Sequence, residues 1–186
     1  IETGRFQYKG EIGGVTIIDD YAHHPTEIEA TLHAAKNYPH QKVWCVFQPH
    51  TYTRTKALLP EFAKALTLAD HVVLADIYAA RETDDLGISS QDLQKQIQEL
   101  GTPCEYFPTF DEIESFLLKS CAHGDLLITM GAGDVVNIGE HLSENSYPHY
   151  PHAYAHSRRA WHVDFFVYNP LDIIQQPIST NTAFFL

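Results

Sequence analysis

Basic residues are scarce in this sequence. Lys and Arg together number 12 against 24 Asp and Glu, which gives a formal net charge of −12 over 186 residues. Nucleic-acid backbones and anionic membranes attract proteins through clustered Lys and Arg. The charge balance therefore argues against nucleic acid or a membrane surface as the main partner, although it leaves room for a local basic pocket.

Cysteines and long apolar runs are also rare. The three cysteines, Cys45, Cys104 and Cys121, lie far apart and form no CxxC pair, so we predict buried, reduced thiols rather than disulfides or a metal site. No apolar stretch approaches the ~20 residues of a membrane span, and no signal-peptide pattern is visible. We predict a cytoplasmic protein. Because the sequence opens on Ile1 and not on Met, we expect a fragment or one domain of a longer chain.

What the sequence does contain is an alternation of β-branched runs and helical patterns. Strands are predicted at residues 15–18, 43–47, 72–75, 104–107 and 126–129, with a hairpin partner at 6–8. Helices are predicted at residues 25–36, 58–68, from Ser89 or Ser90 to 100, from an Asp111 cap to 120, and from the 131–134 turn toward His141. This alternation predicts an α/β fold: a doubly wound, mostly parallel, Rossmann-like sheet with helices on both faces.

Near Ser143 the pattern changes. We predict one domain over residues 1–142, followed by an atypical tail over 143–186 that is rich in Tyr, His and Phe and lacks a helical period. One hypothesis for the tail is a metal-binding tract of His149, His152 and His156. We favour the alternative of a non-native, poorly packed extension, because a metal site needs converging ligands with supporting contacts.

Polar segments follow four of the predicted strands. They read "DDYAHH" (19–24), "QPHTYTR" (48–54), "DIYAARE" (76–82) and "MGAGD" (130–134). Ligands of open parallel sheets bind beyond the carboxyl ends of the strands. Because unrelated turns would be divided between the two edges, four segments at one edge indicate a site.

Each segment also has a purely structural interpretation. Asp20 would suit a helix cap, and the two histidines of "DDYAHH" would suit an ordinary polar turn. Arg54 stands near a helix start, an unfavourable place for a cation, which favours binding of a carboxylate or phosphate. The glycines of "MGAGD" lack the full dinucleotide fingerprint, and Asp134 would repel a phosphate, so we predict a structural role for this turn. Arg81 and Glu82 also fit an ordinary loop ion pair.

Taken together, the segments carry a family resemblance. The stretches "GVTIIDDYAHHPTEIEATLHAAK", "VFQPHTYTRTKAL", "DIYAARE" and "MGAGDV" resemble, in order and spacing, the C-terminal domain of the Mur ligases. The resemblance runs from about residue 4 to 142 and is greatest to the branch of the family that joins L-alanine to UDP-N-acetylmuramate.

The resemblance implies an ATP-dependent ligase of bacterial peptidoglycan synthesis. In the family, ATP phosphorylates the substrate carboxylate, the amine of the amino acid attacks the acyl phosphate, and Mg²⁺ offsets the phosphate charge. The family's P-loop and magnesium ligands belong to a central domain and the UDP-sugar site to an N-terminal one. This sequence contains no GxxxxGK[ST] motif, so we predict the third, closing domain, inactive by itself.

Site residues follow from the resemblance by motif position. Asp20 would contact the nucleotide ribose, whereas Tyr21, His23, His50 and Arg54 would surround the alanine end of the substrate. Arg54 would bind its carboxylate, and His23 or His50 would help to keep the attacking amine neutral. The resemblance implies no metal ligands within this chain.

One departure and two alternatives accompany this assignment. Thr51 stands where many relatives have a second Arg, which weakens the implied carboxylate clamp. Within the family, the alternative is a murein tripeptide ligase. Outside it, the alternative is a stand-alone α/β binding module that does no chemistry.

Overall fold

The computed structural model describes residues 5–144. The strands are β1 (Gln7–Ile12), β2 (Val15–Asp20), β3 (Val43–Phe47), β4 (His71–Leu74), β5 (Cys104–Tyr106) and β6 (Leu126–Met130). The helices are α1 (Pro25–Ala35), α2 (Tyr52–Ala57), α3 (Leu59–Leu66), α4 (Ser90–Glu99), α5 (Phe110–Ser120) and α6 (Val136–Glu144). None of these helices is long and apolar enough to cross a membrane. The tail, with the His149, His152 and His156 hypothesis, lies outside the described residues from position 145 on, so the boundary after residue 142 stays a prediction.

The strands form a six-stranded sheet in the order β1-β2-β6-β3-β4-β5. β1 pairs antiparallel with β2 through a turn at Gly13 and Gly14, and every other pairing is parallel. The carboxyl ends of β2, β6, β3 and β4 therefore meet at one edge of the sheet. The predicted mostly parallel sheet is confirmed.

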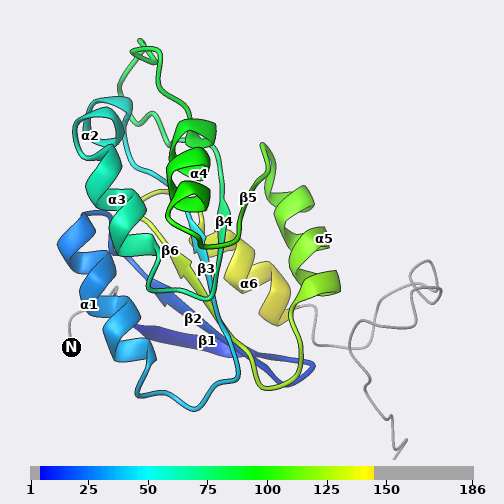
Figure 1. Cartoon of the computed structure of the whole chain (residues 1–186). Coiled ribbons are helices and arrows are strands. Elements are labelled where there is room, and N and C mark those ends of the chain that lie inside the picture. The colour runs from blue at the N-terminus through cyan, green and yellow to red at the C-terminus, as the bar shows by residue number, and fades with distance from the viewer. Residues whose placement is uncertain (1–4, 145–186) are drawn as a thin grey trace, which may run out of the picture.

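Helices cover both faces of this sheet (Figure 1). On one face, Ile28 of α1, Phe62 of α3 and Leu93 of α4 belong to one buried cluster. On the other, Ile113 of α5 and Ile138 of α6 belong to a second cluster. Neighbouring residues of a strand contribute to opposite clusters, as a period of two requires. The doubly wound arrangement is confirmed, and the three free cysteines are buried, also as predicted.

Two local predictions were wrong. The helix predicted over 58–68 is the shorter α3, and a separate helix, α2, precedes it. Pro60 explains the break, because proline lacks an N–H and its ring disturbs the preceding turn of a helix. The cap of α5 is Thr109 and not Asp111, since the Thr109 hydroxyl oxygen accepts from the backbone N–H of Glu112 at 3.3 Å.

Candidate functional site

The four polar segments lie together at the carboxyl edge of the sheet, as predicted. The segments after β3 and β4 form an isolated parallel bridge between His50 and Tyr78, with Thr51 N donating to Tyr78 O at 2.9 Å. The rings of His23 and His50 lie 6.0 Å apart between centroids, which joins the segment after β2 to the segment after β3. Residues that are distant in the chain are thus neighbours here.

Asp20 lies beneath the surface of this edge. Its side chain is buried, with the residue 2% exposed, and its carboxylate accepts from Ala22 N at 2.9 Å, Phe6 N at 3.0 Å and the Thr31 hydroxyl at 2.9 Å. These bonds fix the turn that follows β2. A carboxylate has about four acceptor positions, so the predicted ribose contact stays a prediction, and a structural role accompanies it.

Tyr21 and His23 stand above that turn. Tyr21 is 55% exposed, and its ring meets the His23 ring edge-on at 5.3 Å between centroids. Pro25 begins α1, and the Glu27 carboxylate accepts from the backbone N–H groups of His23 at 3.1 Å and His24 at 3.2 Å. This arrangement is one arm of a capping box and holds the histidine segment at the start of the helix.

His50 and Arg54 come from the segment after β3. Arg54 Nη1 lies 3.5 Å from His50 Nδ1. Burial, together with the charges of Arg54 and His23, lowers the pKa of His50 below its usual value, so the ring is neutral at pH 7. Four of the predicted residues therefore lie close together: Tyr21, His23, His50 and Arg54. The fifth, Asp20, is buried and stabilises the turn that carries Tyr21 and His23.

Thr51, which lies between His50 and Arg54 in the chain, has an unusual backbone conformation. It is the cap of α2, with φ of 68°, a region that β-branched residues rarely adopt. Its hydroxyl oxygen accepts from Arg54 N at 3.4 Å. Strain of this kind persists where the surrounding contacts impose it, and such places are frequent in functional sites.

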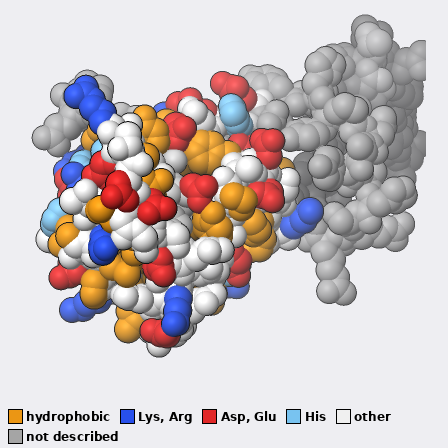
Figure 2. Space-filling model, turned by 90° about the horizontal axis from the view of Figure 1, so that it is seen from above, with side chains coloured by type: hydrophobic (Ala, Val, Ile, Leu, Met, Phe, Trp, Pro, Cys, Tyr) orange, Lys and Arg blue, Asp and Glu red, His pale blue; other side chains and the backbone are white. Residues whose placement is uncertain are grey.

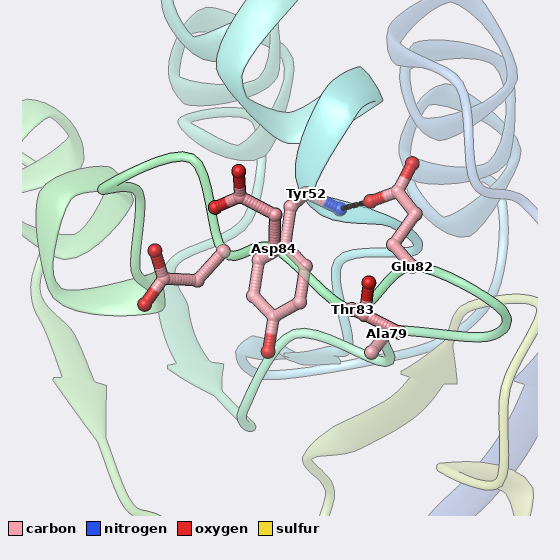
Figure 3. A pocket seen from close by; sticks show the side chains of 6 residues that line it. Tyr52, Ala79, Glu82, Thr83 and Asp84 are labelled. Carbon is pink, nitrogen blue, oxygen red and sulfur yellow. Dashed lines mark hydrogen bonds between the residues drawn. The ribbon is translucent and has the colours of Figure 1, made fainter.

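Tyr78 and Glu82 are further residues of this edge that sequence reasoning had not selected. Tyr78 stacks on His50 at 5.5 Å between centroids and 20° between planes. Glu82 accepts from the backbone N–H groups of Tyr52 at 2.5 Å and Thr53 at 3.0 Å, which caps α2 (Figure 3). This contact replaces the ion pair with Arg81 that we had considered for Glu82. Both residues belong to "DIYAARE", so the segment was predicted but not the roles of its members.

A shallow hollow of about 460 Å³ lies beside this cap. Its lining consists of Tyr52, Ala79, Glu82, Thr83, Asp84 and Asp85. Figure 3 shows these side chains around α2 and the loop after β4. The acidic lining sets the hollow apart from the His50–Arg54 pair next to it.

The glycine-rich turn after β6 is held in place by hydrogen bonds to Gln48, in agreement with the structural role that we predicted for it. Gln48 donates to the Asp134 carboxylate at 2.8 Å, and the Gln48 oxygen accepts from the backbone N–H groups of Asp134 and Val135 at 3.1 and 3.2 Å. A Cβ at Gly133 would lie 2.3 Å from that oxygen and 2.9 Å from the Tyr78 ring. Gly133 therefore lets Gln48 and Tyr78 approach the turn closely.

Within the described residues, metal-ligating side chains do not gather into a cluster. Within 5–144 there is no group of three or more His, Cys, Asp or Glu side chains able to hold a metal ion, and Mg²⁺ prefers carboxylate and other oxygen ligands in near-octahedral geometry. In Figure 2, acidic and basic side chains are interspersed over the visible face of the described part.

Comparison with known proteins identifies the relatives of this chain. The family described as "Mur ligase, glutamate ligase domain" matches residues 4–133. The chain belongs to the Mur ligase family. It corresponds to the C-terminal domain of these enzymes, with the order of motifs that the sequence had shown.

Individual Mur ligases are longer than this chain, which covers only part of each. The UDP-N-acetylmuramate–L-alanine ligase of Lachnospira eligens is 64% identical over 138 residues, which cover 74% of this chain and 30% of the relative. The chain thus spans about a third of the length of the curated relatives that it matches. The crystal structure of UDP-N-acetylmuramate-alanine ligase from Thermotoga maritima matches with a TM-score of 0.58 and 28% identity over 73% of this chain and 28% of that one.

A murein peptide ligase from Psychrobacter arcticus shares the fold as well. Its structure matches with a TM-score of 0.61 and 22% identity over 75% of this chain and 29% of that one. At this identity the match shows the fold alone. The structural likeness therefore does not separate the two branches of the family, whereas the sequence identity of the Lachnospira relative favours the alanine branch.

Proposed function

We propose that this chain is the amino-acid-binding, closing domain of an ATP-dependent ligase that joins L-alanine to UDP-N-acetylmuramate. The observation that carries the proposal is the meeting of Tyr21, His23, His50 and Arg54 at one edge of the sheet. They meet in a chain that is 64% identical, over 138 residues, to a ligase of that name.

Arg54 is the proposed partner of the alanine carboxylate. A guanidinium offers a planar pair of N–H donors that matches a carboxylate, and Arg54 has a neutral imidazole, not an acid, beside it. Tyr21, His23 and His50 form the proposed wall around the amine and methyl groups of alanine. Asp20 is the proposed contact of the nucleotide ribose through acceptor capacity that its internal bonds leave unused.

The chemistry of such a ligase divides between domains. A carboxylate resists attack by an amine until ATP converts it to an acyl phosphate, a step that Mg²⁺ assists by neutralising phosphate charge. The 186 residues contain no P-loop motif, and residues 5–144 contain no metal cluster. We therefore assign the ATP phosphates, Mg²⁺ and the UDP-sugar to other domains of the ligase, and we expect this chain alone to release no phosphate from ATP.

A chimeric ligase tests the proposal. Residues 1–144 would replace the matching domain of the Lachnospira eligens ligase, and phosphate release would be measured with ATP, Mg²⁺ and UDP-N-acetylmuramate. We expect release that depends on L-alanine. Release that depends on a murein tripeptide instead would assign the chain to the tripeptide branch. A folded chimera that is inactive with both would favour a non-catalytic binding module.

Arg54→Ala in that chimera tests the carboxylate assignment. Loss of a charge-assisted contact of about 1.5–3 kcal/mol should raise KM for L-alanine on the order of 10- to 100-fold, with a much smaller change in kcat. Lys64→Ala is the matched control, because Lys64 is an exposed cation of the neighbouring helix α3. Equal effects of the two substitutions would contradict a specific role for Arg54.

A further inference from the structure

The Nδ1 atoms of His23 and His50 have opposite kinds of partner. His23 Nδ1 lies 3.0 Å from the carbonyl oxygen of Tyr21 and 3.6 Å from Glu27 Oε2. A carbonyl and a carboxylate can only accept hydrogen bonds. His23 Nδ1 therefore carries hydrogen, and in the neutral ring the lone pair lies on Nε2.

The contact with Arg54 indicates the other tautomer for His50. Its Nδ1 lies 3.5 Å from Arg54 Nη1, and a guanidinium can only donate. The Nδ1 atom of His50 therefore holds the lone pair, and Nε2 carries the hydrogen. The two neutral rings thus present different groups at Nε2: an acceptor on His23 and a donor on His50.

The charged groups around His23 also differ from those around His50. A protonated His23 would face Glu27, which is anchored by the backbone of His23 and His24 and by Arg5 at 2.9 Å. Although burial acts to raise the pKa of Glu27, the backbone bond from His23 and the charges of His23 and Arg5 lower it overall, so the carboxylate stays ionised. The Nδ1–H side of the His23 ring therefore faces an ionised carboxylate 3.6 Å away.

A protonated His50 would have the opposite surroundings. Arg54 on α2 places a guanidinium nitrogen 3.5 Å from its Nδ1, and the His23 ring lies 6.0 Å from its ring between centroids. Glu82, which caps α2, acts weakly in the other direction, and the Tyr78 ring covers one face of the imidazole. A second cation beside Arg54 is disfavoured, so His50 is suited to remain a neutral N–H donor.

We propose that His23 is the proton acceptor of this site, that Glu27 is the positioning residue that supports its protonated form, and that His50 acts as a hydrogen-bond donor. This inference rests on the proposed ligase function, because it assigns a proton path to the amine of alanine. Glu27 lies outside the predicted site residues and acts through His23, without contact to the substrate.

The proposed step balances as follows. The ammonium of alanine gives one proton to His23 Nε2, and the freed nitrogen lone pair forms a C–N bond with the acyl carbon of the acyl phosphate. The C–O bond to phosphate then breaks, and its electron pair leaves with the phosphate. The second surplus proton of the nitrogen leaves with that phosphate, which gives an amide and hydrogen phosphate.

Nuclear magnetic resonance of the 186-residue chain tests the tautomers without any ligase activity. Long-range ¹H–¹⁵N spectra distinguish Nδ1–H from Nε2–H rings, and His23→Gln and His50→Gln assign the signals. At mildly alkaline pH we expect the Nδ1–H form for His23 and the Nε2–H form for His50. The reverse pattern, or the same tautomer in both rings, would overturn the proposal even if the chimera proved to be an active ligase.

Kinetics of the chimeric ligase test the roles. His23→Gln should lower kcat by about 10²- to 10⁴-fold, as expected for loss of a proton acceptor, whereas His50→Gln keeps an N–H donor and should act mainly on KM. Glu27→Gln retains an acceptor for the cap but loses the charge, and should lower kcat about tenfold with little change in KM. Glu29→Gln, two residues along the same helix, is the matched control.

These outcomes separate the inference from the proposed function. An active chimera in which His50→Gln loses kcat and His23→Gln does not would refute the assignment of the acceptor while leaving the ligase function intact. Equal effects of Glu27→Gln and Glu29→Gln would refute the positioning role. Thermal unfolding of each variant identifies any loss that comes from misfolding alone.

Discussion

Each end of the parallel sheet carries a histidine within a cluster of aromatic and charged side chains, but the partners of the histidine differ. At the amino end, Trp44 Nε1 donates to Asp125 at 2.9 Å, the Trp44 and His71 rings stack at 4.2 Å between centroids, and His71 pairs with Glu105. At the carboxyl end, the imidazole of His50 meets another histidine, a tyrosine and an arginine.

The difference between the ends lies in how the partners are matched. Each acid or histidine named at the amino end has a complementary partner in the chain, and Trp44 is 4% exposed. At the carboxyl end, Tyr21 and Tyr78 are 55% and 38% exposed, and the cation Arg54 has a neutral ring as its neighbour. Residue type alone does not distinguish a site from a structural cluster, whereas the set of partners does.

Removal of the indole at the amino end should give the largest effect on stability. Trp44→Ala would leave a cavity in the core cluster around α5 and α6 and would remove one donor to the buried Asp125. Large-to-small changes of this kind cost about 3–5 kcal/mol. Urea unfolding of the chain measures the loss.

Trp44→Phe supplies the control, since it keeps an aromatic ring but loses the N–H group. Asp125 retains its bond from Ala122 N at 2.9 Å, so this change should cost clearly less. A loss from Trp44→Ala no greater than that from Trp44→Phe would show that the amino end does not stabilise the fold through packing.

Gly133→Ala should give an intermediate effect at the carboxyl end. The added Cβ would meet Gln48 Oε1 at 2.3 Å and the Tyr78 ring at 2.9 Å, so either side chain must move. Overpacking of a tight contact costs about 1–3 kcal/mol. Urea unfolding measures the cost, and loss of the contact between the Tyr78 and His50 rings in nuclear Overhauser spectra reports the displacement. An unchanged ring contact with unchanged stability would contradict the role given to this glycine.

The fold and the clustering of segments could be predicted because both depend on local patterns. Five β-branched runs separated by helices fix a parallel sheet, and parallel strands place "DDYAHH" and "QPHTYTR" at one edge. Helix α2 escaped prediction because its six residues have no apolar stripe: of these, Thr55 alone is buried. Its geometry depends on Glu82, 30 residues along the chain from Tyr52.

The partners of individual side chains could not be predicted either, because they also depend on residues that are distant in the chain. Trp44 and Asp125 are 81 residues apart, and neither belongs to a motif. The resemblance selected His23 and His50 but left their roles open, because a tautomer depends on which atom of a neighbour approaches Nδ1. That information exists only once the chain is folded.

The smallest expected effect concerns pH and again separates the two ends. Because burial and Arg54 lower the pKa of His50 in the folded chain, the unfolded chain binds a proton more readily. Stability from this group is therefore complete above the ordinary histidine pKa of about 6.5 and is lost as pH falls from there through the lowered value. His50→Gln should reduce the loss of stability on acidification, as measured by urea unfolding at a series of pH values. His33→Gln, at an exposed position of α1, should leave the loss as in the wild type, and a greater effect from His33 than from His50 would place the acid sensitivity outside the carboxyl end.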